Sequence, residues 1–384
     1  MTDPVFYLTT TQGDRTGGPE CIHQLTDALI RRGLEAYIVP LKNFRGQTPD
    51  PEYSIYQYKL ADRVPKHKNA ILLSAEVSPI ESFRDFRAIP PERTWMWWLS
   101  VHNNPDPRAR YFRGTNECCQ FSPRDSGQPL DQPPALVQRG TKTRVLPFTS
   151  ANTLPLLKES WERKGPGGAN PGSFKAFGVE FASLLYNRSK IESDISFISQ
   201  SVYGQGFCQS VLGKPALPVT DYLRRPDVDA VKGPGNVVLY NGAKGYSMVV
   251  RLKELMPHVD FKPIEGMSFQ QVCEALASAT MYVELGVPPG RDRLPRESVH
   301  FGTPVALLCR GSAYCWDDFP LPAEYRISFA ENWESQMVTA ITKTLNDPAA
   351  ALKDQSKFAE WIAGDKSRYE NEVDLWVSAV IERM

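Results

Sequence analysis

Short apolar runs and an amphipathic stretch alternate over the first forty residues. Val5–Leu8 is apolar and rich in β-forming residues, and Ala36–Val39 is a second run of this kind. Between them, apolar positions recur at helical spacing and a glycine follows: Ile22, Leu25, Leu29 and Gly33. This order predicts a strand, a helix and a second strand, which together form one unit of a parallel α/β sheet.

The pattern continues through the first half of the chain. Proline- and glycine-rich segments at 129–134 and 165–172 are typical of exposed loops. The expected elements are a helix over 177–190 and strands at 70–74, 94–101, 195–199 and 217–222. We therefore predict a first Rossmann-like domain over residues 1–215, which would carry the acceptor side of a site.

The second half alternates strands and helices more regularly. A polar segment with prolines and glycines, 224–235, is typical of a linker, and Ser268 and Gln271 form a capping box for a helix. Strands are expected at 236–241, 259–264, 281–285 and 303–308. The alternation predicts a doubly wound parallel sheet in a second Rossmann-like domain, over residues 216–365.

The tail of the chain is strongly amphipathic. After Gly364, apolar residues fall at i, i+3, i+4, i+7 and i+8: Val373, Trp376, Val377, Val380 and Ile381. A helix with such a face must bury it, and we expect the helix at 366–384 to pack back on the first domain.

Charge and composition narrow the function classes. The 384 residues contain 44 Lys and Arg and 44 Asp and Glu, so the formal net charge is zero. Neutrality argues against nucleic acid or an anionic membrane as the main partner. No apolar run approaches the roughly 18 residues of a membrane-spanning helix.

Cysteine usage and the first residues indicate the compartment. The seven cysteines are scattered without paired spacing, so the sequence predicts no zinc site. The chain begins without a basic, apolar leader, and we expect no signal peptide. The prediction is a cytoplasmic protein, with attachment to the inner face of the membrane as an open alternative.

Arginines gather in a loop that leaves a predicted strand and enters a helix. The guanidinium groups of Arg291, Arg293 and Arg296 are forked hydrogen-bond donors suited to phosphate oxygens. The carboxylate of Glu297 can accept hydrogen bonds from two hydroxyl groups, such as those of a ribose. Loops of this kind bind ligands in open α/β sheets. The alternative is a solvated loop with internal ion pairs.

Two glycine-containing turns are further candidates for phosphate binding. Gly17 and Gly18 precede the first helix, where backbone amides can approach an anion. The turn lacks the GxGxxG pattern, which argues against a dinucleotide cofactor. In the second half, Lys244 follows Asn241 in a turn with glycines on both sides. The alternative for Lys244 is a surface lysine in a tight turn.

A polar cluster follows the aromatic strand at 94–101. His102 is its best candidate for function, because an imidazole can contact a sugar hydroxyl or a developing charge. A capping or turn cluster, with Asn103 and Asn104, is the equal alternative. Asp227 and Asp229 lie in the linker, and we interpret them as structural rather than as metal ligands.

Taken together, these motifs resemble the retaining glycosyltransferases of the GT-B fold, family 4 type, in the branch of bacterial surface-glycan pathways. The resemblance rests on residues 1–40 and 236–309, with the Asn-Gly-Ala-Lys-Gly turn at Lys244 and the Arg-Leu-Pro-Arg-Glu segment ending at Glu297. It implies that Lys244 binds the donor diphosphate, that Glu297 holds the ribose, and that Gly17 and Gly18 lie beneath the donor phosphates.

The chain departs from the family pattern at two positions. Pro289 stands where the first glutamate of E-x7-E belongs, and Asn241 lies near the place of an arginine. Arg291 or Arg293 is expected to supply that missing charge.

The resulting hypothesis is transfer of a sugar from a nucleotide-sugar donor to a hydroxyl of an acceptor glycan or glycoconjugate, with retention, in polysaccharide synthesis. Lys244, Arg293 and His102 are the expected catalytic residues, and no cofactor or metal is expected. Two alternatives stay open: a nucleotide-sugar epimerase or phosphorylase on the same fold, and an inactive binding subunit motivated by Pro289. A DNA-modifying transferase is a narrower version of the main hypothesis, which the neutral charge disfavours.

Overall fold

The computed structural model describes most of both predicted domains but leaves a long stretch of the first outside. The described residues are 3–11, 17–41, 49–65, 68–76, 89–103, 195–224, 226, 228, 235–329 and 332–384. The helix expected over 177–190, the loops expected at 129–134 and 165–172, and Asn104, Asp227 and Asp229 lie outside them.

The N-terminal domain is built on a six-stranded parallel sheet with strand order β2-β1-β3-β4-β5-β6. Its strands are β1 (Val5–Thr10), β2 (Glu35–Pro40), β3 (Ala70–Ala75), β4 (Thr94–Trp98), β5 (Ser196–Ser199) and β6 (Ala216–Pro218). The helices described beside it are α1 (Gly17–Arg31) and α7 (Val202–Val211). Because β6 pairs with β5, this sheet runs just past residue 215, where we expected the first domain to end.

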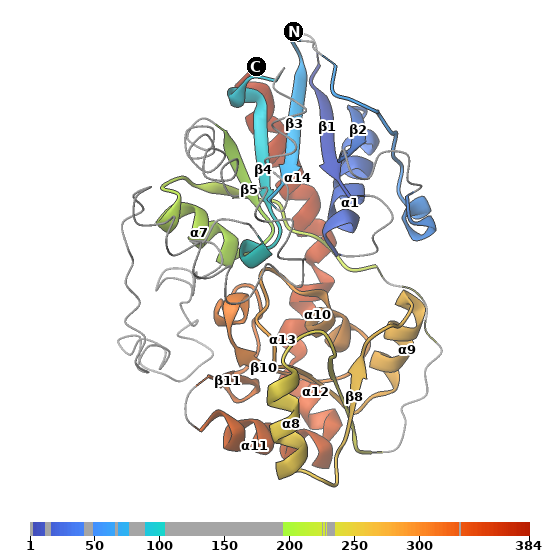
Figure 1. Ribbon diagram of the computed structural model, residues 1–384, viewed down its shortest axis with the longest axis vertical. Coiled ribbons are helices and arrows are strands. Elements are labelled where there is room, and N and C mark those ends of the chain that lie inside the picture. The colour runs from blue at the N-terminus through green and yellow to red at the C-terminus, as the bar shows by residue number, and fades with distance from the viewer. Residues whose placement is uncertain are drawn as a thin grey trace, which may run out of the picture.

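The C-terminal domain holds a five-stranded parallel sheet with strand order β11-β10-β9-β7-β8, which confirms the doubly wound fold class (Figure 1). Its strands are β7 (Val237–Asn241), β8 (Asp260–Ile264), β9 (Met281–Glu284), β10 (Val305–Cys309) and β11 (Arg326–Ser328). The helices between and after them are α8 (Tyr246–Leu255), α9 (Phe269–Ser278), α10 (Arg293–His300) and α11 (Trp333–Asn346). The capping box of Ser268 and Gln271 is present at the start of α9.

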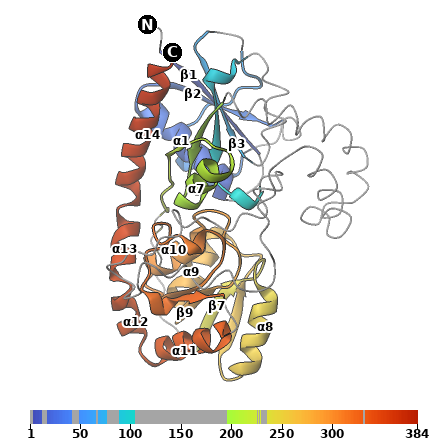
Figure 2. The same cartoon turned by 90° about the vertical axis from the view of Figure 1, so that its left-hand side faces the viewer.

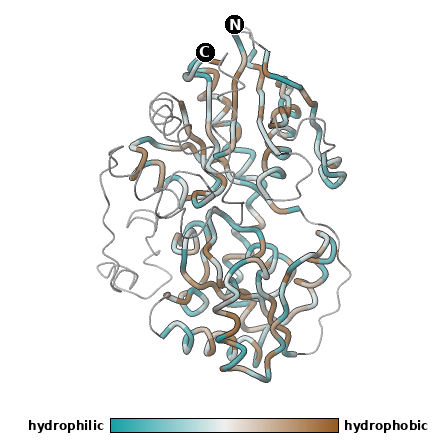
Figure 3. The backbone as a smooth tube through the Cα atoms, in the orientation of Figure 1, coloured by the Kyte–Doolittle hydropathy of each residue, from teal (hydrophilic) through white to brown (hydrophobic). Residues whose placement is uncertain are grey.

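Short 3-10 helices complete the description. They are η2 (Pro51–Ile55), η3 (Pro91–Arg93), η4 (Val101–Asn103), η5 (Gly311–Tyr314) and η6 (Ala323–Tyr325). Apolar stretches run through the middle of both domains (Figure 3), and every residue of strands β4, β9 and β10 is buried. Each sheet is therefore the centre of its own hydrophobic core.

Three consecutive helices lead from the C-terminal domain back to the N-terminal one: α12 (Pro348–Asp354), α13 (Ser356–Ala363) and α14 (Asp365–Glu382). Figure 2 shows them along one side of the molecule, with α14 beside the first domain. Trp376 packs on Phe6 and Trp95, with ring centroids 5.4 and 6.0 Å apart. The expected return of the tail is confirmed. Ile381 is an exception to the predicted apolar face, because it is 46% exposed.

The ends of two strands, one from each sheet, meet at the domain junction. Val101, just beyond β4, donates its backbone N–H to the carbonyl of Pro289, just beyond β9, at 2.8 Å. A Cβ atom on Gly290 would lie 2.2 Å from the carbonyl oxygen of Leu99, so only glycine fits there. The carboxyl edges of the two parallel sheets, where ligands bind in such folds, therefore lie close to each other.

Candidate functional site

The candidate site lies where the strand order of the C-terminal sheet reverses, between β7 and β9. Strand β7 has β8 on one side and β9 on the other, so the loops after β7 and β9 leave the sheet toward opposite faces. Gly245 has φ of 80°, and a Cβ atom there would lie 2.8 Å from the carbonyl carbon of Leu285. A Cβ atom on Gly286 would lie 2.7 Å from Cβ of Lys244. The two loops pack so closely that glycine is required in each.

This packing places Lys244 at the edge of the sheet with its ammonium group accessible. The side chain is 34% exposed, and its Nζ lies 2.5 Å from Oδ2 of Asp292. Burial lowers the pKa of Lys244, but Asp292 and Glu284 outweigh it and raise the pKa above its ordinary value. Lys244 is therefore a cation at neutral pH.

Glu284 is a member of the site that sequence reasoning missed. It ends strand β9, is fully buried, and accepts hydrogen bonds from the Tyr282 hydroxyl at 2.7 Å and the Gly286 amide at 2.9 Å. Burial raises the pKa of Glu284 and Asp292 raises it further, while Lys244 opposes both. The available signal was a carboxylate inside an otherwise apolar strand.

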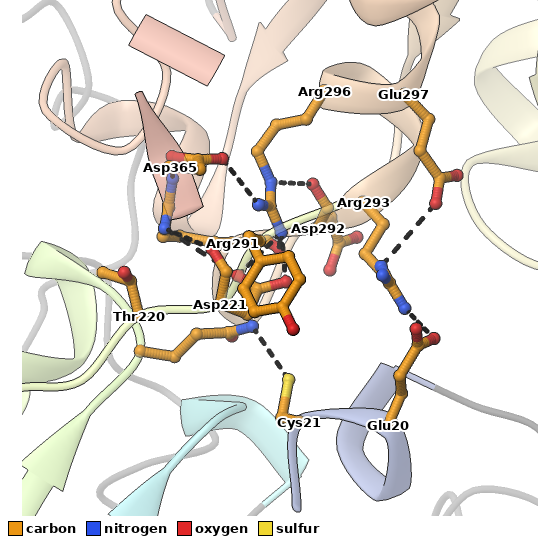
Figure 4. A network of polar contacts seen from close by, with 12 residues as sticks. Glu20, Cys21, Thr220, Asp221, Arg291, Asp292, Arg293, Arg296, Glu297 and Asp365 are labelled. Carbon is orange, nitrogen blue, oxygen red and sulfur yellow. Dashed lines mark hydrogen bonds and ion pairs between the residues drawn. The ribbon is translucent and has the colours of Figure 1, made fainter. Parts of the chain in front are cut away.

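Two of the three predicted phosphate-binding arginines are buried. The side chains of Arg291 and Arg296 are 1% and 0% exposed. Both pair with Asp221 and Asp365 in a buried network (Figure 4), and Arg291 also lies over the ring of Trp361 at 4.3 Å. Their guanidinium groups are enclosed by protein atoms, which favours the alternative of internal ion pairs, and their role in donor binding stays a prediction.

The two aspartates explain the position of this network. Asp221 follows β6, where the chain leaves the N-terminal sheet, and Asp365 begins α14, where the chain returns. Burial raises the pKa of Asp221, but Arg296 and Arg291 outweigh it and hold the pKa below its ordinary value. Arg291, in the loop before α10, and Arg296, on α10 itself, thus bind both segments that connect the two domains.

Arg293 has a different environment. Its side chain is 16% exposed and pairs with Glu20 of α1, in the other domain, while its Nε lies 3.6 Å from Oε1 of Glu297. A Cβ atom on Gly17 would lie 3.5 Å from Cδ of Arg293, and one on Gly18 would lie 3.8 Å from Leu99. The structure therefore brings the Gly17–Gly18 turn, Arg293 and Glu297 together across the domain junction.

Glu20 is a second residue that the sequence did not single out. Its carboxylate accepts a hydrogen bond from the hydroxyl of Tyr56 at 2.8 Å and pairs with Arg224 at 2.8 Å, in addition to Arg293. Burial raises the pKa of Glu20, but Arg293 and Arg224 outweigh it and hold the pKa below its ordinary value. Its role could not be expected from the first turn of a helix alone.

Glu297 and Asn241 occupy positions close to those expected. Glu297 is 5% exposed, and burial raises its pKa even though Arg293 and Arg296 oppose the shift. The Asn241 side chain accepts a hydrogen bond from the Ala243 amide at 3.0 Å, which shapes the turn before Lys244. Their roles toward a ligand stay predictions.

His102 belongs to the N-terminal side of the junction. Its Nε2 lies 2.7 Å from the hydroxyl of Tyr203 on α7, and the two rings meet edge to face at 5.5 Å. This contact ties η4 to α7, which agrees with the structural alternative. A catalytic role for His102 stays a prediction.

Pro289, where the resemblance leads us to expect a glutamate, forms part of the domain junction. Besides the contact of its carbonyl with Val101, the adjacent carbonyls of Pro288 and Gly290 accept hydrogen bonds from the Ser312 amide at 2.9 Å and the Ser312 hydroxyl at 2.5 Å. The loop is held by its backbone, which a proline tolerates because only its carbonyl is used.

Two further features are absent from the described residues. No cluster of histidine, cysteine, aspartate and glutamate there has the arrangement of a metal site. None of the helices described is both long and apolar enough to cross a membrane.

Comparison with known proteins supports the architecture. No family model and no curated protein matches the chain. Sucrose-phosphate synthase from Thermosynechococcus elongatus is similar in structure, with a TM-score of 0.61 and 11% identity over 99% of this chain and 100% of that one. The chain has the GT-B fold.

Two further structures are less similar. T4 phage BGT in complex with UDP and Mn²⁺ has a TM-score of 0.49 and 10% identity, over 98% of this chain and 99% of that one. Medicago truncatula UGT71G1 complexed with UDP-glucose has a TM-score of 0.47 and 11% identity, over 98% of each chain. Neither likeness carries a statement about function.

Proposed function

We propose that this protein is a glycosyltransferase that moves a sugar from a nucleotide-sugar donor to a hydroxyl group of an acceptor glycan or glycoconjugate. The observation that carries the proposal is the position of Lys244. Its accessible ammonium lies at the carboxyl edge of the sheet, between the β7 and β9 loops, which is where open α/β sheets bind phosphate groups. The sequence resemblance to GT-B glycosyltransferases supports the same assignment.

The chemistry fits the charges around this position. Departure of a nucleoside diphosphate builds negative charge on the phosphate oxygens, and fixed cations stabilise that charge in the transition state. Lys244 and Arg293 both belong to the C-terminal domain, and Arg293 lies next to the Gly17–Gly18 turn of the N-terminal domain. Together they would bind the diphosphate at the domain junction.

The remaining features of the reaction follow from the resemblance. Retention of configuration is expected, with the departing phosphate taking the acceptor proton, so that no protein nucleophile is required. Lys244 and Arg293 would do the work that a metal ion does in other transferases. The carboxylate oxygens of Glu297 can accept hydrogen bonds from the two ribose hydroxyl groups. Because Glu297 lies beside Arg293, the ribose and the phosphate would bind at adjacent positions. A role in polysaccharide synthesis is part of the same proposal.

The test has a binding stage and a product stage. Uridine, guanosine, adenosine and thymidine diphosphates are screened by thermal shift, since a ligand at ~100 times its Kd stabilises a fold by roughly 2.7 kcal/mol. The matching nucleotide sugars are then incubated with hydroxyl acceptors, and the anomeric configuration of the product is read by NMR. Failure of every nucleotide to stabilise the protein would overturn the proposal.

An inactive binding subunit is the second candidate, and Pro289 favours it. The family glutamate is absent there, and the residue's carbonyl joins the two domains instead. This candidate predicts nucleotide binding without turnover of any nucleotide sugar, alone or with an acceptor. Product formation at the second stage of the test decides between the two.

A further inference from the structure

Lys244 has two carboxylate neighbours that differ in how firmly they are held. Glu284 is fully buried, and both of its oxygens accept hydrogen bonds, one from the Tyr282 hydroxyl and one from the Gly286 amide. Asp292 is 18% exposed, and its carboxylate makes no capping hydrogen bond to α10 although it stands at the N-cap. Glu284 is thus held in place by the fold, whereas Asp292 is held by its ion pair with Lys244.

The ion pair between Asp292 and Lys244 affects how an anion can bind to the lysine. The ammonium of Lys244 has three N–H donors, and one of them is directed at Oδ2 of Asp292 at 2.5 Å, so a diphosphate that binds the other two meets this carboxylate beside it. If Asp292 stayed in place, its negative charge would lie beside the phosphate oxygens, and like charges at such distances repel strongly away from bulk water. Release of Asp292 from the lysine would therefore favour anion binding.

We propose that Asp292 is an exchangeable counter-ion, which the donor diphosphate displaces from Lys244, and that Glu284 is the positioning residue that keeps the ammonium in place during the exchange. The inference rests on the proposed function and adds the two acidic residues to its site.

The start of α10 gives the displaced carboxylate a destination. An N-cap aspartate normally accepts a hydrogen bond from the backbone amide at N2 or N3. In α10 the residue at N2 is Leu294, and Pro295 at N3 has no amide hydrogen. Rotation of the Asp292 side chain toward the Leu294 amide would thus replace the lost ion pair with a capping bond and free Lys244.

Glu284 is suited to the fixed role because it has no such freedom. It ends the central strand β9, and a Cβ atom on Gly286 would lie 2.8 Å from its Oε1 and 2.7 Å from Cβ of Lys244. The carboxylate, the glycine and the lysine stem therefore form one closely packed unit. The carboxyl group of Glu284 therefore stays near the ammonium whether Asp292 is attached or released.

The experiment compares diphosphate binding by calorimetry in the parent and in Asp292→Asn. The ligands are uridine, guanosine and adenosine diphosphates and inorganic pyrophosphate. Removing the competing carboxylate should tighten binding by roughly fivefold, the scale of a partly exposed ion pair. Glu265→Gln is the matched control, because Glu265 is an exposed carboxylate on the neighbouring β8 loop that does not pair with Lys244. It should change affinity by less than about twofold.

Glu284→Gln tests the positioning role through pH. The neutral amide can still bond to Tyr282 and Gly286, so the fold is expected to persist. The alkaline loss of diphosphate affinity, which reports deprotonation of Lys244, should move to lower pH, because a counter-charge has been removed. A purely structural role would leave the position of that alkaline limb unchanged.

The outcomes separate the two proposals. If the parent binds a diphosphate and Asp292→Asn binds it no more tightly than Glu265→Gln does, the exchange is refuted and the glycosyltransferase proposal stands. An unmoved alkaline limb in Glu284→Gln refutes the positioning role. If neither the parent nor Asp292→Asn binds any of the ligands, the proposed function and this inference both fail.

Discussion

Arg296 donates hydrogen bonds from Nη2 to both carboxylate oxygens of Asp221, at 2.9 and 2.8 Å, and neither side chain is more than 1% exposed. The two residues are 75 positions apart and come from different domains. Arg291 and Asp365 join the same network, so the two chain crossings and the start of α10 are held at one buried point. Any motion of one domain against the other must therefore either keep these buried ion pairs intact or break them.

Removing Asp221 should therefore destabilise the protein severely. In Asp221→Ala, Arg296 and Arg291 keep their buried charges and lose a partner, which typically costs about 3–5 kcal/mol. Urea denaturation would measure the loss. The matched control is Asp260→Ala, which breaks an exposed pair with Lys262 at 3.0 Å and should change stability by less than about 0.5 kcal/mol. Equal effects of the two substitutions would show that the buried network contributes little.

Trp376 should anchor the returning helix. It is fully buried against Phe6 and Trp95, and truncation of a buried tryptophan costs about 3–5 kcal/mol. The preceding residue, Leu375, is 64% exposed on the same helix and provides the control. Leu375→Ala should remain within about 0.5 kcal/mol of the parent in the same denaturation experiment. Comparable losses would mean that α14 is not held by its buried face.

Most of the strands and the buried face of α14 were predictable because they depend on local periodicity, and the capping box was predictable because it is a short local motif. Strand β11 (Arg326–Ser328) was not expected. Val238 and Tyr240, for example, alternate with their neighbours along β7 and pack in one core cluster. The fate of the arginines was not predictable in this way. Arg291, Arg293 and Arg296 look alike in the sequence, yet two are sealed by aspartates distant in the chain and one pairs across the junction with Glu20.

Glu284 illustrates a second reason why some site residues could not be predicted from the sequence. Its importance depends on the register of β9 beside β7, which brings the end of one strand next to the turn after the other. The sequence of one strand does not show which strand pairs with it. Lys244 was found because glycines flank it and mark a tight turn, whereas its two carboxylate partners carry no comparable local signal.

Glu76 should make stability depend on pH. It lies fully buried after β3, accepts a hydrogen bond from the Leu99 amide at 2.9 Å, and burial raises its pKa to about 8. Between pH 4.5 and about 8 the folded state holds a proton that the unfolded state has released. The stabilising contribution of this protonation therefore falls as pH rises, by at most about 1.4 kcal/mol for each pH unit.

The variant Glu76→Gln keeps an acceptor for Leu99 and removes the titration. Its free energy of unfolding, measured by urea denaturation from pH 5 to 8, should be flatter with pH than that of the parent. The difference between the two proteins should be largest near pH 8. Parallel pH profiles would contradict a raised pKa at this position.

Glu297 should determine whether a ribose is recognised. If its carboxylate accepts the ribose hydroxyls, Glu297→Ala should weaken binding of a ribonucleoside diphosphate by roughly 1.5–3 kcal/mol, the scale of hydrogen bonds to a charged group. The 2′,3′-dideoxy analogue is the control ligand, because it lacks those hydroxyls and should bind parent and variant about equally. Calorimetry that shows equal losses for both ligands would remove Glu297 from the ribose site and leave it as a counter-ion of Arg293.

Lys244 should matter for the rate of transfer far more than for the fold. Losing one contact that stabilises a leaving diphosphate in the transition state typically costs about 10²–10³ in turnover. Lys244→Ala should show such a loss in kcat with a melting temperature close to that of the parent, since the side chain is 34% exposed. Lys262→Ala, on the exposed pair with Asp260, is the matched control and should transfer sugar at the parental rate. Turnover by Lys244→Ala within about threefold of the parent, roughly 0.65 kcal/mol, would show that Lys244 is only a turn residue and would leave Arg293 as the cation that carries the phosphate.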